Sequence, residues 1–118
     1  MLIQSTLAIL LFSVLGPPGD TRISDAAQNG NLAVVQTLIK EKVDVKTPQG
    51  DGTTALHWAA YREDLTMTRL LLQAGADPKA RRRLGNMTAL HLAASTGNPQ
   101  LIDMLLKAGA ETDAANGN

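Results

Sequence analysis

The chain has 118 residues, which is enough for one domain at most. Eleven Lys and Arg residues balance eleven Asp and Glu residues, so no net charge draws the protein toward nucleic acid or a membrane surface. The sequence has no cysteine, which excludes disulfides, thiolate nucleophiles and thiolate metal ligands.

The first 18 residues differ in kind from the rest. An apolar run at 7–15 is followed by Gly16-Pro17-Pro18-Gly19, which ends any helix. The run is too short to cross a bilayer, which takes about 20 apolar residues, but it has the length of a signal-peptide core. We therefore expect a signal peptide and linker over 1–18 and a secreted or periplasmic protein. The alternative is a cytoplasmic protein whose first segment is a helix packed on the following domain.

The remaining chain repeats itself. The segment Thr54-Ala55-Leu56-His57-Trp58-Ala59-Ala60 returns nearly unchanged at 88–94, a spacing of 34 residues. A weaker copy precedes it at a spacing of 33, aligning Ala26-Ala27 with Ala59-Ala60. A period of this size predicts stacked repeats, each of which covers its apolar face with a neighbour. The three units are about 19–51, 52–85 and 86–118.

Each unit should contain two helices. Thr21 is placed to cap the first helix of the first unit, which should run through Gln28. The second helices should begin after Asn31, Asp64 and Asn98, whose side chains can accept hydrogen bonds from backbone N–H groups. Apolar residues recur on one face of each second helix and should be buried: Leu32, Val35, Leu38 and Ile39; Leu65, Met67, Leu71 and Leu72; Leu101, Ile102, Leu105 and Leu106.

Some positions depart from the shared pattern. Glu63 stands where the other units have a turn glycine, and Lys42 stands where they have the glycine that closes the second helix. If the backbone is left-handed there, each side chain costs about 1 kcal/mol. Ser24 and Asp25 replace His57 and Trp58 in the first unit, a polarity that suits a unit with one side in water.

The pattern T-x-L-H-x-A-A, a short turn, and L-x-x-x-L-L-x-x-G-A-D resembles the ankyrin repeat over nearly the whole chain from residue 19. The resemblance implies an all-α ankyrin-repeat solenoid of helix-turn-helix units. It also implies short extended or β-hairpin fingers, at 45–53 and 79–87. Because no polar capping unit follows the third repeat, we expect the chain to be the N-terminal part of a longer array, or else a protein whose last repeat is imperfectly closed.

The resemblance implies a non-catalytic scaffold that binds a protein partner in a concave groove and on its fingers. The sequence has no G-x-S-x-G, G-x-x-x-x-G-K or G-x-G-x-x-G motif. His57 and His91 lie at equivalent positions, about 8–10 Å apart on stacked helices, too far to share a metal ion. We expect no enzyme activity, no catalytic, cofactor or metal site, no small-molecule substrate, no stable membrane span, and a monomer.

Partner contacts are expected where the units vary most, at the finger tips and the outer ends of the first helices. In the ankyrin family these positions line the groove; here they are Gln49, Asp51, Thr53, Trp58, Tyr61, Arg62, Arg81, Arg82, Arg83, Leu84, Met87, Ser95 and Thr96. The run Arg81-Arg82-Arg83 has no acidic residue near it in sequence, between Pro78 and Ile102, so we expect an acidic partner segment. One alternative is that the finger is a solvated loop, and another is that it binds an anion or, as the less expected partner, a nucleic acid. A further alternative is that the chain is the regulatory part of a larger enzyme.

Overall fold

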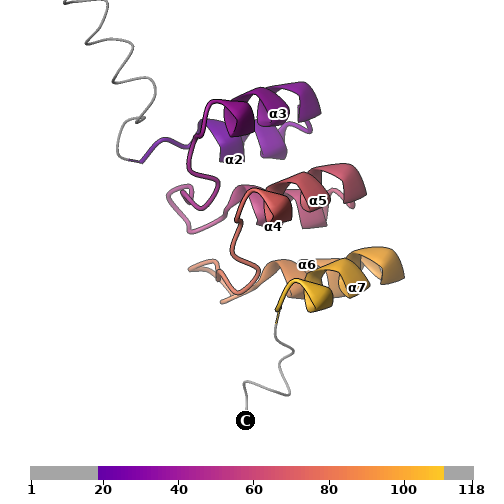
Figure 1. Ribbon diagram of the computed structural model, residues 1–118. Helices are drawn as coiled ribbons and strands as arrows, with labels where there is room; N and C mark the ends of the chain where they lie inside the picture. Colours follow the sequence, from indigo (N-terminus) through magenta and orange to yellow (C-terminus); the bar gives the residue numbers. More distant parts are fainter. Residues whose placement is uncertain (1–18, 111–118) are drawn as a thin grey trace, which may run out of the picture.

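The computed structural model describes residues 19–110, and all structural statements concern these residues. They form six helices: α2 (Arg22–Gln28), α3 (Leu32–Lys40), α4 (Ala55–Tyr61), α5 (Leu65–Gln73), α6 (Ala89–Thr96) and α7 (Pro99–Lys107). Consecutive helices pair, and the three pairs stack so that α2, α4 and α6 form one row and α3, α5 and α7 the other (Figure 1). The predicted all-α stack of helix-turn-helix units is confirmed. The predicted leader at 1–18 lies outside the described residues.

The predicted caps of the second helices are confirmed. The side chains of Asn31 and Asp64 accept hydrogen bonds from the backbone N–H groups of Val34 and Met67, and Asn98 accepts from two such groups. The prediction for Thr21 is wrong. Its side chain makes no cap bond, because its hydroxyl donates to Asp25 Oδ2 at 3.1 Å, and the neighbouring Asp20 carboxylate accepts the N–H of Arg22 at 3.1 Å.

Glu63 and Lys42 are left-handed, as the aligned glycines suggested, with φ of 56° and 64°. The cause is the turn that ends each helix. Glu63 N–H donates to Ala60 O at 3.1 Å and Asp64 N–H donates to Ala59 O at 3.0 Å, the pair of bonds that closes a helix through one left-handed residue. The same pair forms in the first repeat around Gly30, whose φ is 71°. Two repeats therefore share one turn although one of them lacks glycine.

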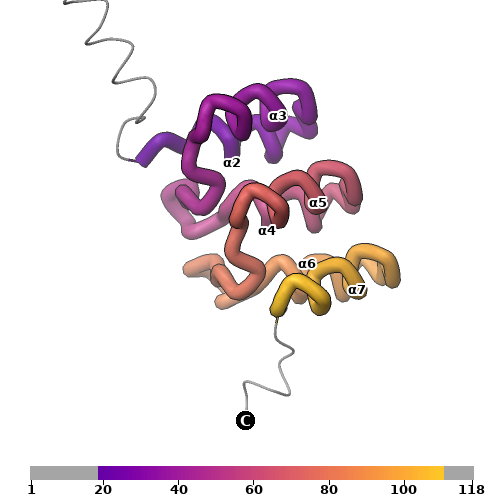
Figure 2. Tube along the Cα trace, viewed as in Figure 1, coloured from indigo at the N-terminus to yellow at the C-terminus, as the bar shows by residue number. Residues whose placement is uncertain are grey.

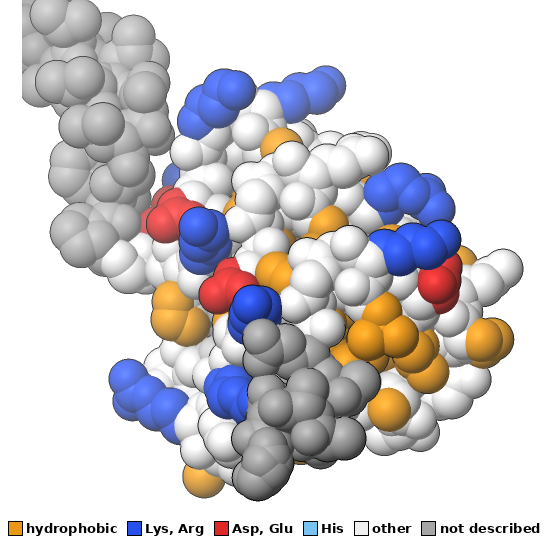
Figure 3. All heavy atoms as spheres, turned by 60° about the horizontal axis from the view of Figure 1, so that its bottom comes forward, with side chains coloured by type: hydrophobic (Ala, Val, Ile, Leu, Met, Phe, Trp, Pro, Cys, Tyr) orange, Lys and Arg blue, Asp and Glu red, His pale blue; other side chains and the backbone are white. Residues whose placement is uncertain are grey.

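The core is a continuous column of Leu, Val, Ile, Met and Ala between the two rows, with Val35, Leu71 and Leu105 fully buried. Most of the predicted stripe is buried or partly buried, but Leu106 is 41% exposed and that prediction is wrong. No described residue covers that side of the third repeat, whereas the equivalent Leu72 is covered in part. Figure 3, in which this end of the stack comes forward, shows apolar side chains grouped at the surface.

Both fingers leave the stack on the same side, at the left of Figure 2. They contain no β-strand in the part of the chain that the structure describes, so the expected hairpins are reduced to turns. Backbone hydrogen bonds close the turns, from Gln49 N–H to Thr53 O at 2.8 Å in the first and from Arg82 N–H to Met87 O at 2.9 Å in the second. The residue that lengthens the second period lies inside this second turn. Short turns bring the two finger tips within hydrogen-bond distance of each other, through Arg83 N–H and Asp51 O at 2.9 Å.

Candidate partner-binding site

A pocket of about 270 Å³ opens where the second finger meets α4 and α6. Its walls are Thr53, His57, Trp58, Tyr61, Arg82 and Leu92. Four of these residues were predicted to contact a partner, and the structure brings them together from two fingers and one helix. His57 and Leu92 were not predicted as lining residues. Leu92 occupies the position of Trp58 in the next repeat, so the alignment of repeats carries the signal that could have found it.

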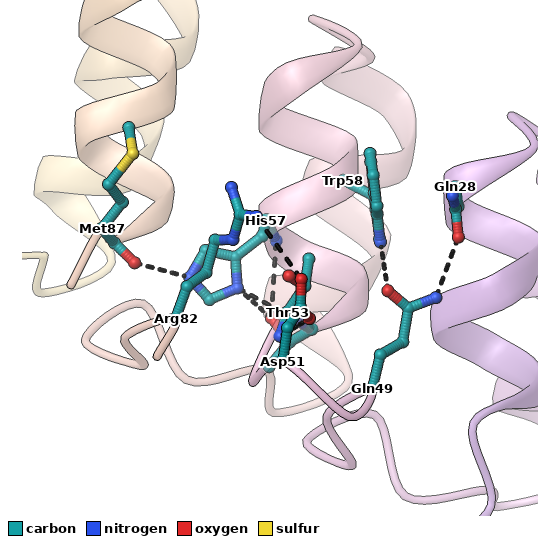
Figure 4. Close-up of polar contacts among 9 residues, drawn as sticks. Gln28, Gln49, Asp51, Thr53, His57, Trp58, Arg82 and Met87 are labelled. Atoms are coloured by element: carbon teal, nitrogen blue, oxygen red, sulfur yellow. Dashed lines mark hydrogen bonds and ion pairs between the residues drawn. The ribbon is translucent and has the colours of Figure 1, made fainter. Parts of the chain in front are cut away.

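The aromatic wall of the pocket is fixed in place. Trp58 and Tyr61 are three residues apart on α4 and so share a face, with ring centroids 5.9 Å apart and planes at 86°. The indole N–H donates to Gln49 Oε1 at 2.9 Å, and Gln49 Nε2 donates to Gln28 Oε1 at 3.0 Å (Figure 4). Gln49 Nε2 also donates to Asp25 Oδ1 at 2.8 Å. Gln49 thus ties the indole to α2, whereas the Tyr61 side chain is 61% exposed. The result is a rigid, partly open aromatic surface.

The polar wall includes Arg82, whose guanidinium is paired with Asp51 of the first finger. Arg82 Nη2 lies 3.4 Å from Asp51 Oδ2, and Asp51 Oδ1 accepts the N–H of Thr53 at 2.9 Å. The Thr53 hydroxyl lowers the pKa of the Asp51 carboxyl most, followed by the Thr53 N–H and then Arg82, so Asp51 is ionised at neutral pH. The Thr53 hydroxyl is buried beside the Asp51 carboxylate but has no hydrogen-bond partner of good geometry. The arginine run has no acidic residue near it in sequence, but in the folded chain Asp51 of the preceding finger lies beside it.

Gly52 permits this close approach of the fingers. Its φ is +86°, and a Cβ built there would lie 3.0 Å from the backbone N of Arg83. Such a contact is with backbone and cannot be relieved by a rotamer change. A glycine at this position therefore keeps Asp51 beside the second finger.

His57 forms the base of the pocket and is only 1% exposed. Its Nδ1 accepts the N–H of Thr54 at 3.0 Å, which leaves the proton on Nε2, and Nε2 donates to Ala80 O and Met87 O, both at 3.1 Å. Burial lowers its pKa, the Met87 and Ala80 carbonyls oppose that shift, and Arg82 adds to it. A neutral histidine that joins three backbone groups holds the second finger on α4.

Ser24 does the same for the first finger. It occupies the position of His57 in the first repeat, it is fully buried, and its hydroxyl donates to Thr47 O at 2.9 Å. Thr47 is in turn the equivalent of Ala80. The expectation that the polarity of Ser24 reflects exposure to water is wrong, because the hydroxyl replaces an imidazole N–H.

The other predicted contact residues lie outside the pocket. Arg62 reaches back to the first repeat, where Nη1 donates to Gln28 O at 3.2 Å. The hydroxyls of Ser95 and Thr96 donate to carbonyls of their own helix, both at 2.7 Å. Met87 packs against the core, and Leu84 is 71% exposed at the finger tip. Arg81 Nη1 donates to Asn86 O at 2.9 Å within its own finger, and Arg83 is exposed.

Two further properties of the described residues bear on the site. None of the helices in 19–110 is long and apolar enough to cross a membrane. No three or more His, Asp or Glu side chains in that range gather as a metal ion would require.

Comparison with known proteins identifies the family. The family of ankyrin repeats (three copies) matches residues 23–116. The chain is 45% identical over 56 residues to palmitoyltransferase akr1 of Schizosaccharomyces pombe, covering 47% of this chain and 9% of that protein. It is 40% identical over 52 residues to potassium channel AKT1 of Arabidopsis thaliana, covering 44% and 6%. It is 41% identical over 46 residues to the Notch-regulated ankyrin repeat-containing protein of Xenopus tropicalis, covering 39% and 40%. The chain thus spans less than half the length of each of these relatives, and what it shares with them is the repeat, so this chain belongs to the ankyrin repeat family.

Proposed function

We propose that this protein is a non-catalytic scaffold that binds an extended segment of a protein partner across the second and third repeats. Ankyrin repeats are generally protein-interaction modules, which supports the class of function. The partner segment lies along the fingers and places one of its side chains between Trp58, Tyr61 and Arg82.

The single observation that carries the proposal is the rigid aromatic pocket. Aromatic side chains dominate binding energy where they form a pocket that a partner can fill. Trp58 is already held by Gln49, and it packs edge-to-face on Tyr61, so little conformational freedom is lost on binding. The volume of about 270 Å³ falls just below the roughly 300–1,000 Å³ typical of small-molecule sites and suits one large side chain.

The exposed arginines contribute to the approach of the partner. Arg81 and Arg83 flank Arg82 on the same finger and are both exposed. Exposed charges act mainly on the association rate, whereas an aromatic contact acts mainly on dissociation. The finger and the pocket thus have separable roles in one binding event.

A peptide-display selection on the full chain tests the proposal without a known partner. Peptides enriched from a random library should bind at least tenfold more weakly to Tyr61→Ala, which is about 1.4 kcal/mol, through faster dissociation. Arg69→Ala, an exposed change on α5, is the matched control and should bind as the wild type does. Both variants should keep the wild-type melting temperature. Equal binding to wild type and Tyr61→Ala would refute the pocket as the anchor.

A second candidate is suggested by the relatives themselves. The matched segments form 9% of a palmitoyltransferase and 6% of a potassium channel, so a repeat array of this kind occurs inside much larger proteins. In that case the same surface would be the partner-binding part of a larger protein that also contains another domain. A full-length reading frame distinguishes this candidate from a scaffold of repeats alone.

Export is a separate proposal that depends on the apolar run at 7–15. Secreted or periplasmic protein should lack roughly 15–20 N-terminal residues by intact mass. Recovery of the whole chain from the cytosol would contradict it.

A further inference from the structure

The three arginines of the second finger have different surroundings. The Arg82 side chain is 27% exposed, lines the pocket and is paired with Asp51. Arg81 and Arg83, the residues directly before and after Arg82, are exposed. Consequently the charge of Arg82 at the pocket wall already faces a carboxylate, whereas Arg81 and Arg83 form no ion pair with any residue that the structure describes.

We infer that Asp51 determines which side chain the pocket accepts: a neutral, apolar side chain of the partner binds inside, and carboxylates next to it in the partner segment bind Arg81 and Arg83. The inference rests on the proposed function and refines the earlier expectation of an acidic partner. The acidic residues of the partner segment are expected next to its anchor, which is the side chain that enters the pocket, and not at the anchor position itself.

The exclusion follows from charge. A carboxylate in the pocket would have to share the Arg82 guanidinium with Asp51, and the two negative charges would lie a few ångströms apart near the protein surface. Like charges at that separation repel strongly where water screens them only in part. Trp58, Tyr61 and Leu92 meanwhile offer apolar contact to an uncharged side chain.

Asp51 cannot readily turn away to admit a second carboxylate. Its Oδ1 accepts the N–H of Thr53 at 2.9 Å, and its own carbonyl accepts the N–H of Arg83 at 2.9 Å. The first bond fixes the carboxylate within its own finger, and the second joins the backbone of Asp51 to the second finger. The negative charge therefore stays beside Arg82, next to the residues that line the pocket.

The test uses peptides selected on the full wild-type chain, with the anchor located by alanine scanning. Three versions of one peptide carry Leu, Gln or Glu at the anchor, so that Gln and Glu differ only in charge. The wild type should bind the Gln version at least about tenfold more tightly than the Glu version. Asp51→Asn should reduce that ratio to within about threefold, because it removes the negative charge beside Arg82. The asparagine amide keeps an oxygen that can accept the Thr53 N–H, so the turn should stay intact.

The chain offers a matched control for this variant. Asp44 lies in the loop before the first finger, is exposed, and accepts the N–H of Lys46 at 2.9 Å just as Asp51 accepts that of Thr53. Asp44→Asn removes the same charge and the same kind of local bond away from the pocket, and it should keep the wild-type ratio of Gln to Glu binding. Changing a flanking carboxylate of the peptide to an amide should weaken binding to the wild type but not to Arg81→Ala with Arg83→Ala.

The outcomes separate the inference from the proposed function. If Glu and Gln anchors bind the wild type equally, or if Asp51→Asn keeps the wild-type ratio, the inference fails and the proposed function stands. If no selected peptide is weakened by Tyr61→Ala, both fail. If the protein self-associates and Tyr61→Ala abolishes that association, the occupant is a second copy of this chain and the inference is overturned.

Discussion

Replacing His57 with alanine tests how the second finger is held to the helix row. The change removes the acceptor of the Thr54 N–H and the donor shared by Ala80 O and Met87 O. Each hydrogen bond contributes about 1 kcal/mol, and a buried group left unpaired costs about 1–3 kcal/mol. The free energy of unfolding should therefore fall by roughly 3 kcal/mol, a large part of the 5–15 kcal/mol typical of a whole domain.

Ser24→Ala provides the comparison, because the serine has the same position in its repeat but makes one bond to the finger. Its cost should be about 1 kcal/mol. Urea unfolding followed by circular dichroism measures both values by linear extrapolation. If His57→Ala costs no more than Ser24→Ala, the shared imidazole bonds do not hold the finger and the reasoning is refuted.

Three more predictions follow from the fold. Glu63→Gly should raise the free energy of unfolding by up to about 1 kcal/mol, because Glu63 is left-handed, and a decrease in urea unfolding would contradict this. The folded-state pKa of His57 lies below the unfolded value of 6.5, so the unfolded chain takes up the proton first. The stability present above pH 6.5 should therefore decline as pH falls below it, by up to about 1.4 kcal/mol per pH unit, and His57→Gln should remove that slope from melting curves. Hydrogen exchange should protect amides of α7 less than those of α5, because the second repeat has described neighbours on both sides and the third on one side alone, and equal protection would count against it.

Local features of the fold could be predicted from the sequence because their causes are local. A cap depends on a side chain that reaches two or three residues along the chain, as Asn31, Asp64 and Asn98 do. The left-handed positions Glu63 and Lys42 could be found by aligning them with glycines. The prediction for Thr21 was wrong because its hydroxyl donates to Asp25 and does not cap the helix. The sequence alone does not say which of these two partners the hydroxyl takes.

Burial at the ends of the stack could not be predicted from periodicity. The spacing of apolar residues gives the face that a helix presents, but it does not say whether another repeat covers that face. Leu106 has the spacing of a core residue and is 41% exposed. Ser24 has the polarity of a surface residue and is fully buried, because a finger carbonyl meets its hydroxyl. For Leu106 the outcome depends on whether another repeat covers the helix, and for Ser24 it depends on the finger of its own repeat.

The arginine run shows why charge in a repeat protein has to be analysed across the stack as well as along the chain. A period of 33 or 34 residues places each finger beside the one before it, so residues about one period apart become neighbours. Asp51 and Arg82 are 31 positions apart and form an ion pair, and Asp51 and Arg83 are joined by a backbone hydrogen bond. Counting acids within the second finger misses this contact, whereas counting them one period upstream finds Asp51. The apparent cluster of three equivalent cations thus resolves into one paired arginine at the pocket wall and two exposed arginines beside it.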